Sequence, residues 1–187
     1  MKIANEGHWG VLETKQEEVN AKGKIRVLFL DCDGVINNMY QFRRGHGGIS
    51  LGRLGTASVA NILPLCKLID ILCENGYYIV YSTAWNISGS DRITECLSHI
   101  CDRAKLDKVI LGCTPYIYDT EFGREGEIQH FIDTCGVEIE KFAIIDDCDI
   151  VGFDGSFVKT EDNTGMLDYH VMRTHNILTG DHTRHYV

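Results

Sequence analysis

Long apolar runs and an excess of positive charge are both missing from this sequence. No apolar stretch approaches the roughly 20 residues that span a bilayer, and the polar N-terminal segment has no signal-peptide core. The formal net charge is −9 at pH 7, so we expect no broad nonspecific binding of nucleic acid, which depends on many Lys and Arg contacts to phosphate. A local basic rim is still compatible with this charge. We therefore expect a soluble cytoplasmic protein with no membrane span.

The sequence also has no C-x-x-C pair of cysteines and no low-complexity linker. None of the eight cysteines forms a C-x-x-C pair, and most lie in apolar segments, which favours reduced, buried thiols over disulfides. A chain of 187 residues with 44% hydrophobic content suits one domain with a sizeable core. We expect this domain at 25–178. Residues 1–24 are interpreted as an N-terminal extension that packs on the domain without building it, and 179–187 as a tail.

The segment 25–34 (IRVLFLDCDG) places two aspartates directly after an apolar run. A β-rich run that does not alternate with polar residues is typical of a strand covered on both faces. Asp31 and Asp33 would end it, where ligands bind in open α/β sheets, and Gly34 would let the chain turn sharply. Two adjacent carboxylates need compensation, most simply from a divalent cation. The alternative is that both aspartates only cap a turn or helix.

Further β-rich runs alternate with helical patterns along the chain. This alternation predicts one doubly wound α/β domain with a mainly parallel five-stranded sheet and helices on both faces. Pro64 lies inside the first helical pattern and predicts a kink or a late helix start. The expected strands are 27–30, 77–81, 108–111, 142–145 and 157–159, and the expected helices are 56–74, 91–101, 123–135 and 165–178, with a short one around 12–19.

Polar side chains follow two more of these strands. Ser82 and Thr83 end the second strand, where a hydroxyl can hold a phosphate oxygen, and Asp146 and Asp147 end the fourth. A second strand that ends in two acids makes capping a weaker explanation for both pairs. Arg124 lies at a helix start, where the macrodipole does not favour a cation, so it either binds an anion or is a solvated surface residue.

A glycine-rich basic loop follows the first strand. Arg43 and Arg44 in this loop could contact substrate, or belong to a solvated hairpin.

The ordered motifs resemble those of the haloacid dehalogenase-like (HAD) phosphohydrolase superfamily. They are most similar to the capless HAD domains of RNA-repair proteins, and the resemblance covers about residues 25–178. The motifs are D-C-D-G at 31–34, I-V-Y-S-T-A-W at 79–85, T-P at 114–115, G-R-E-G-E-I at 123–128, I-I-D-D at 144–147 and T-G-M-L at 164–167. This resemblance implies a three-layer Rossmann-like core.

The resemblance also implies roles for individual residues. Asp31 would be the nucleophile that forms an aspartyl-phosphate, and Asp33 the general acid and base. Ser82 and Thr83 would bind the phosphoryl group, and Arg124 would be the third-motif cation, with Lys141 as its rival. The implied cofactor is Mg²⁺, bound by Asp31, the backbone carbonyl of Asp33 and Asp147, with Asp146 as a further ligand or an orienting group.

Two features depart from the superfamily pattern. Val35 follows Gly34, where many members have Thr, and Asn86 follows Trp85, where the repair-associated branch often has Arg. If that arginine reads substrate, its role is missing here or passes to Arg92, Arg43 or Arg44. Trp85 could itself contact substrate, by stacking a base or gripping a phosphotyrosine ring, or could simply pack its loop.

The distances between motifs leave no room for a large cap domain. The segment 37–55 is only loop-sized, and an uncapped crevice admits large substrates. The expected partner is therefore a phosphorylated nucleic-acid end or phosphoprotein, with a polynucleotide 3′-phosphate favoured. A phosphotyrosine or small-nucleotide phosphatase and a non-catalytic phosphate-binding module are the alternatives.

Overall fold

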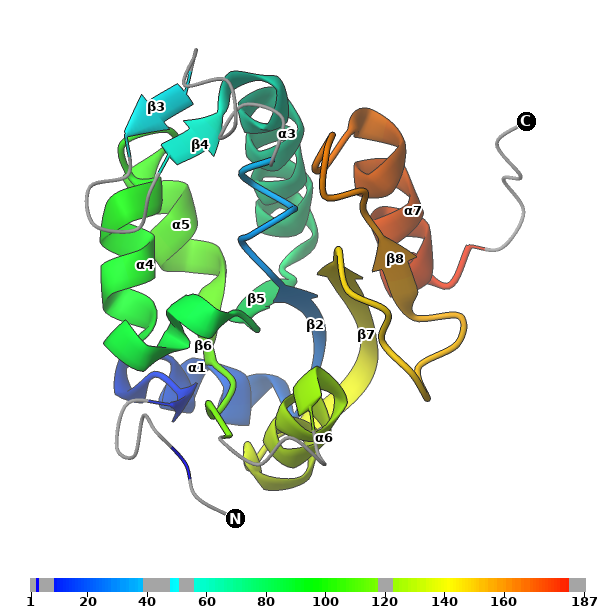
Figure 1. Cartoon of the computed structure of the whole chain (residues 1–187). Helices are drawn as coiled ribbons and strands as arrows, with labels where there is room; N and C mark the ends of the chain where they lie inside the picture. The colour runs from blue at the N-terminus through cyan, green and yellow to red at the C-terminus, as the bar shows by residue number, and fades with distance from the viewer. Residues whose placement is uncertain (1–2, 4–8, 39–47, 51–55, 118–122, 182–187) are drawn as a thin grey trace.

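The computed structural model describes residues 3, 9–38, 48–50, 56–117 and 123–181. Within these ranges the chain forms a six-stranded sheet in the order β1-β6-β5-β2-β7-β8 and a separate two-stranded hairpin of β3 and β4 (Figure 1). The strands of the large sheet are β1 (Gly10–Val11), β2 (Lys24–Leu30), β5 (Tyr78–Tyr81), β6 (Ile110–Cys113), β7 (Glu138–Asp146) and β8 (Phe157–Lys159). All neighbours pair in parallel except β1 and β6. The predicted α/β class and mainly parallel sheet are confirmed.

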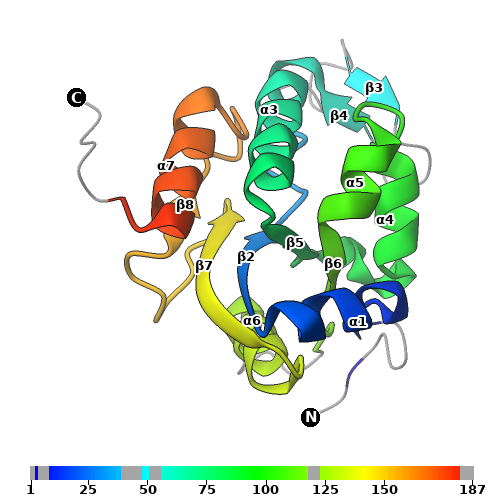
Figure 2. The same cartoon turned by 180° about the vertical axis from the view of Figure 1, so that it is seen from behind.

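Strand β2 is covered on both faces, as its unbroken apolar run predicts. Leu28 and Leu30 belong to one core cluster, and Val27 and Phe29 to the other, each with no exposed surface. Residues from helices α3, α4, α5 and α7 fill the first cluster, and residues from α1 and α6 the second. These two helix layers lie on opposite sides of the sheet (Figures 1 and 2). The helices are α1 (Glu13–Lys22), α3 (Val59–Asn75), α4 (Ser90–Leu97), α5 (Arg103–Val109), α6 (Gly123–Thr134) and α7 (Asp168–Thr179).

The first helix after β2 starts late. Residues expected to open it form β4 (Thr56–Ser58), which pairs antiparallel with β3 (Gly48–Ser50), and α3 begins at Val59. Pro64 therefore lies in the second turn of α3. Between β2 and α3 the described part of the chain holds only the turn after β2 and this hairpin, so no large cap is present there. This agrees with the predicted absence of a cap.

The region between β5 and β6 contains more helix than expected. After a short 3₁₀ helix, η2 (Ala84–Ser88), helix α4 ends at Leu97, and a second helix, α5, precedes β6. Asp102 starts α5, because its carboxylate accepts a hydrogen bond from the backbone N–H of Ala104 at 2.8 Å. Strand β6 consequently begins at Ile110, two residues later than predicted.

The N-terminal segment contributes to the sheet and to the core. Strand β1 extends the sheet at its β6 edge, with Gly10 opposite Cys113 and Val11 opposite Gly112. Val19 of α1 is fully buried in the second core cluster. Residues 10–22 thus build the domain, in contrast to the expectation for an appended extension, and the sheet has six strands instead of five.

The first turn of helix α7 contains a buried histidine. The Nδ1 of His170, which has no exposed surface, accepts a hydrogen bond from the backbone N–H of Leu167 at 2.8 Å. Burial lowers the pKa of His170 to about 4. His170 is therefore neutral in the folded protein at neutral pH.

None of the eight cysteines forms a disulfide, as predicted. Cys32, Cys101, Cys113 and Cys135 are buried, three others are partly buried, and Cys148 is exposed. No described helix is long and apolar enough to cross a membrane.

Candidate active site

Three adjacent strands end at the same level and carry three polar residues there. Leu30 is in register with Tyr81 on β5 and with Ile145 on β7, so the next residues, Asp31, Ser82 and Asp146, lie side by side. The main chain keeps them there, because Asp31 N–H donates to the Ile145 carbonyl (3.0 Å) and Ser82 N–H to the Leu30 carbonyl (2.9 Å). All three residues are at most 3% exposed. The carboxyl edge of the parallel strands therefore forms the floor of the site.

A tight turn after β2 brings in Asp147. Gly34 has φ +68°, and a Cβ on it would lie 2.3 Å from Oδ2 of Asp147, so the carboxylate packs directly on the glycine backbone. The Thr160 hydroxyl donates to the Gly34 carbonyl at 3.0 Å and ties the turn to the end of β8. The glycine is thus needed both for its positive φ and for the space that Asp147 occupies.

Arg124 is the cation at the centre of this acidic group. From the first turn of α6 its guanidinium contacts Asp31 Oδ1 at 3.5 Å, Asp146 Oδ2 at 3.3 Å and Glu127 Oε2 at 3.5 Å. Lys141, the rival cation, lies on β7, five residues before Asp146 and opposite Arg26 of β2. Its Nζ lies beside Gly180, which follows the last residue of α7. The structure brings Arg124, and not Lys141, to Asp31.

Glu127 is a residue of this site that the sequence analysis missed. It is 5% exposed, and its other oxygen accepts the backbone N–H of Ile117 at 2.9 Å. It therefore links Arg124 to the segment that follows β6. Its place one turn after Arg124 in the G-R-E-G-E-I motif was the available signal, since residues three apart on a helix share a face.

The carboxyl groups of the floor are held at an electrostatic cost. Burial raises the pKa of Asp31, of Asp146 and of Asp147; the charge of Arg124 opposes this for Asp31 and Asp146. One arginine thus offsets only part of the cost of holding these groups as anions.

The donor set at the strand ends fits a hard divalent cation. Asp31, Asp146 and Asp147 offer carboxylate oxygens, the ligands that Mg²⁺ prefers. Asp146 Oδ2 is in ionic contact with Arg124 but accepts no hydrogen bond within the described residues. Ligand atoms of Asp146, Asp147 and Cys148 lie within 4.8 Å of one another. The site residues therefore fit a magnesium ion, with Asp146 and Asp147 as neighbouring donors.

Two hydroxyls end β5, and they have different surroundings. Ser82 Oγ is buried and has no hydrogen-bond partner in the part of the chain that the structure describes. Thr83 Oγ1 accepts a hydrogen bond from the backbone N–H of Trp85 at 3.4 Å and so caps η2. A hydrogen bond from the Thr83 side chain also acts to lower the pKa of Asp31. Ser82 is therefore the hydroxyl with unused hydrogen-bonding capacity.

Asp33 differs from Asp31 in being exposed, yet it is held by two donors. The indole Nε1 of Trp85 donates to Oδ2 at 3.0 Å, and the amide Nδ2 of Asn37 donates to Oδ1 at 2.7 Å. Neither contact was predicted, because each joins residues whose proximity depends on the fold or on the turn.

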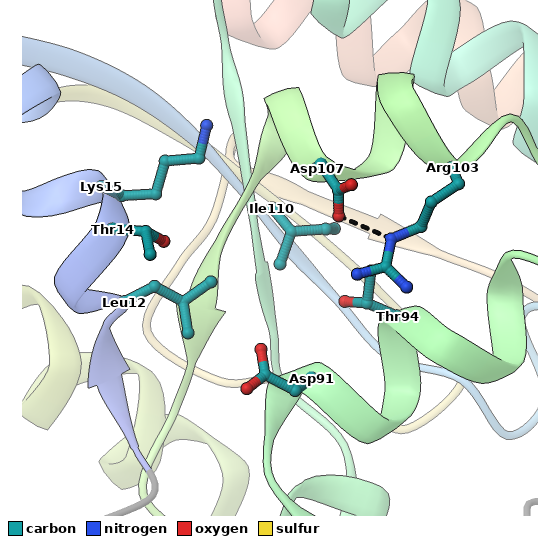
Figure 3. Close-up of a pocket in the computed structure, with 8 residues that line it drawn as sticks. All are labelled: Leu12, Thr14, Lys15, Asp91, Thr94, Arg103, Asp107 and Ile110. Carbon is teal, nitrogen blue, oxygen red and sulfur yellow. Dashed lines mark hydrogen bonds and ion pairs between the residues drawn. The ribbon is translucent and has the colours of Figure 1, made fainter.

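The remaining predicted contacts lie elsewhere. Arg43 and Arg44 lie outside the described residues, and Arg92 is exposed on α4. A separate pocket lies between α1, α4 and α5 (Figure 3). Its lining includes Lys15, Asp91 and the Arg103–Asp107 ion pair, and none of the strand-end residues described above.

The fold and this site define the class of the protein. A family model described as the HAD domain in Swiss Army Knife RNA repair proteins matches residues 27–171, more than three quarters of the chain. The chain belongs to this family, a capless HAD domain linked to RNA repair, which supports a HAD-type hydrolase in general terms. Comparison with curated proteins gives no significant match, and neither does comparison with solved structures.

Proposed function

We propose that this chain is a Mg²⁺-dependent phosphatase that hydrolyses phosphate monoesters through an aspartyl-phosphate on Asp31. The observation that carries the proposal is the position of Asp31, in register between Ser82 and Asp146 with Arg124 in contact. A nucleophile, a hydroxyl donor and a cation then surround one small volume, which is the arrangement that phosphoryl transfer requires.

The first step forms the covalent intermediate. A carboxylate oxygen of Asp31 attacks phosphorus, and the bond from phosphorus to the leaving oxygen breaks. Asp33 gives its proton to that oxygen. The Ser82 hydroxyl donates to a non-bridging phosphoryl oxygen, and the Arg124 guanidinium offsets the negative charge that Asp31 and the phosphoryl group bring together.

The second step releases phosphate. Asp33, now a carboxylate, takes a proton from a water molecule, whose oxygen attacks the phosphorus of the aspartyl-phosphate. The bond to Asp31 breaks, inorganic phosphate leaves, and Asp31 is a carboxylate again. Mg²⁺, held by Asp31, Asp147 and Asp146, would neutralise the charge that builds up between the nucleophile and the phosphoryl oxygens.

A large substrate is the best match to an uncapped crevice. The described residues between β2 and α3 form a hairpin and no lid domain, so an end of a polymer can reach Asp31. The family's link to RNA repair favours a polynucleotide 3′-phosphate over a phosphotyrosine peptide or a free nucleotide. The absence of disulfides among the eight cysteines is compatible with the cytoplasmic setting that such a role implies.

The test compares four kinds of substrate, one substitution in the site and one control substitution. Wild-type protein with Mg²⁺ is assayed on a 3′-phosphorylated oligonucleotide, a phosphotyrosine peptide, free nucleotides and p-nitrophenyl phosphate. Asp31→Asn should reduce hydrolysis of all of them to background while the far-UV circular dichroism stays unchanged, and Asp154→Asn, at an exposed position, should be fully active.

Two results would contradict the proposal. Full activity of Asp31→Asn would refute the mechanism. A wild-type protein that hydrolyses none of the panel but binds phosphorylated ends would make the chain a non-catalytic binding module.

A further inference from the structure

The carboxylate of Asp33 is held from two directions although it lies at the surface. Asn37 Nδ2 donates to one oxygen at 2.7 Å, and Trp85 Nε1 donates to the other at 3.0 Å. Asn37 belongs to the turn that follows β2, and Trp85 to η2, which follows β5. An exposed aspartate normally samples several rotamers, whereas donors on two separate elements restrict it to one.

The donor from Asn37 is fixed by the turn itself. Asn37 Oδ1 accepts the backbone N–H of Gly34 at 2.9 Å. Because an N–H can only donate, the amide oxygen must face Gly34, and the NH₂ group must therefore face Asp33. The orientation of the Asn37 amide is thus set by the main chain of the motif that contains Asp33.

The donor from Trp85 is fixed by the core. The buried Asn86 donates from Nδ2 to the Tyr81 carbonyl at 3.0 Å and to the Thr114 carbonyl at 3.2 Å, which anchors η2 to the ends of β5 and β6. The ring of Trp85 packs against the first core cluster. Its apolar part is thus used for packing, and its N–H is directed at Asp33.

We infer that Trp85 and Asn37 are positioning residues that hold Asp33 where it exchanges protons with the leaving oxygen and with water. This inference rests on the proposed function. A general acid or base works only within hydrogen-bond reach of the proton it transfers, so a side chain held in one rotamer spends more time in reach. Trp85 then has a role other than the substrate stacking considered from its sequence position.

The two contacts leave Asp33 able to act. A carboxylate offers about four lone-pair positions, two on each oxygen, and the clamp uses one on each. A position on either oxygen is still available for the transferred proton. The pair of donors therefore restricts the direction of the carboxylate without blocking its chemistry.

One experiment tests the clamp without any turnover. The chain contains two tryptophans, so Trp9→Phe assigns the indole N–H signal of Trp85 in a ¹⁵N-labelled sample. Asp33→Ala should move the Trp85 indole proton upfield, toward an indole bonded only to water, and leave the Trp9 signal in place. An unmoved Trp85 signal overturns the inference.

A second experiment tests the effect on proton transfer. Trp85→Phe keeps an aromatic ring and removes the N–H, and Asn37→Ala removes the other donor. Two substrates are compared: phenyl phosphate, whose leaving oxygen needs a proton, and p-nitrophenyl phosphate, whose leaving oxygen needs it much less. Each variant should lower kcat for phenyl phosphate about tenfold with KM nearly unchanged, because general acid catalysis contributes about a hundredfold or more in total.

The expected pattern is specific to positioning. The loss should be much smaller with p-nitrophenyl phosphate, the double variant should approach the loss of Asp33→Asn, and Trp9→Phe should leave both rates unchanged. An equal loss on both substrates, or an increase in KM alone, overturns the inference in favour of a structural or substrate-contact role. A wild-type protein that hydrolyses neither of these esters nor any other substrate of the panel refutes the proposed function instead, while the indole signal still decides whether the hydrogen bond exists.

Discussion

Replacing Arg124 by methionine should cost far more stability than replacing any exposed arginine. The side chain of Arg124 is 19% exposed, and it contacts carboxylates whose side chains are 4% (Asp31), 7% (Glu127) and 1% (Asp146) exposed. Methionine fills a similar volume without charge. The substitution therefore leaves three buried acids without their cation.

The expected magnitude follows from burial more than from distance. At an effective dielectric constant of 20, a pair of charges about 3.5 Å apart interacts by about 5 kcal/mol, but the desolvation of both groups offsets much of this. Removing one partner of a buried pair costs about 3–5 kcal/mol, because the other partner stays buried and unpaired. In a chain of this size that corresponds to a fall in Tm of roughly 10 °C.

The assay is urea unfolding at pH 7 in the presence of EDTA, followed by circular dichroism. Arg103→Met is the matched control: Arg103 lies closer to its partner, 2.7 Å from Asp107, but both side chains are more than half exposed. Its loss should be at most about 0.5 kcal/mol. Lys141→Met should also cost less than about 1 kcal/mol, and Arg124→Lys, which keeps the charge but not the planar fork, should fall in between.

A stability loss for Arg124→Met no larger than that for Arg103→Met would contradict this expectation. That result would mean that the acids of the site are already protonated or solvated in the metal-free protein. A larger loss of stability for Lys141→Met than for Arg124→Met would instead indicate that Lys141 of β7 is the cation that stabilises the site.

Three further predictions concern the turn, the metal and the buried histidine. Gly136→Ala, at positive φ with open space around it, should lose about 1–2 kcal/mol in urea unfolding, and Gly34→Ala should lose more, because its Cβ also meets Asp147. Only Gly34→Ala should also lose the proposed phosphatase activity; equal activities would contradict this. In a thermal melt, Mg²⁺ at a hundred times its Kd should stabilise the wild type by about 2.7 kcal/mol and should stabilise Asp147→Asn much less. Equal stabilisation of both proteins would show that Asp147 does not bind the metal. The free energy of unfolding of the wild type, measured by urea titration relative to that of His170→Asn, should fall by up to about 3 kcal/mol between about pH 6.5 and about pH 4. A difference between the two proteins that does not change with pH would be inconsistent with a buried neutral histidine.

The sign of the histidine effect follows from its lowered pKa. In the folded protein the pKa of His170 is about 4, below its ordinary value of 6.5. Between these values the unfolded chain binds a proton that the folded chain does not, so acid favours unfolding in this range. Asparagine can accept the Leu167 N–H without titrating, which is why it is the suitable comparison.

The residues at the strand ends were accessible from the sequence because two rules acted together. Apolar β-rich runs identified β2, β5 and β7, and parallel topology requires their carboxyl ends to meet at one edge. Asp31, Ser82 and Asp146 follow those runs directly, so their proximity could be predicted without coordinates. Arg124 was accessible for a different reason, since a cation is unfavourable in the first turn of a helix.

Other features had no comparable local signal. Strand β1 is two residues long, too short for a period-two pattern, and its pairing with β6 spans about a hundred residues of sequence. The contact of Trp85 with Asp33 likewise joins residues 52 apart. Helix α5 did carry a signal, the cap residue Asp102, but its seven residues were too few to outweigh the apolar run that follows.

The register of β2 with β5 and β7 has a consequence for how the protein should lose activity. Neighbouring strands lie about 4.8 Å apart, so main-chain hydrogen bonds set the spacing of Asp31, Ser82 and Asp146. The amide protons of Asp31 and Ser82 are themselves part of this ladder and should exchange only through global opening. We therefore expect thermal inactivation of the site to coincide with cooperative unfolding of the central sheet.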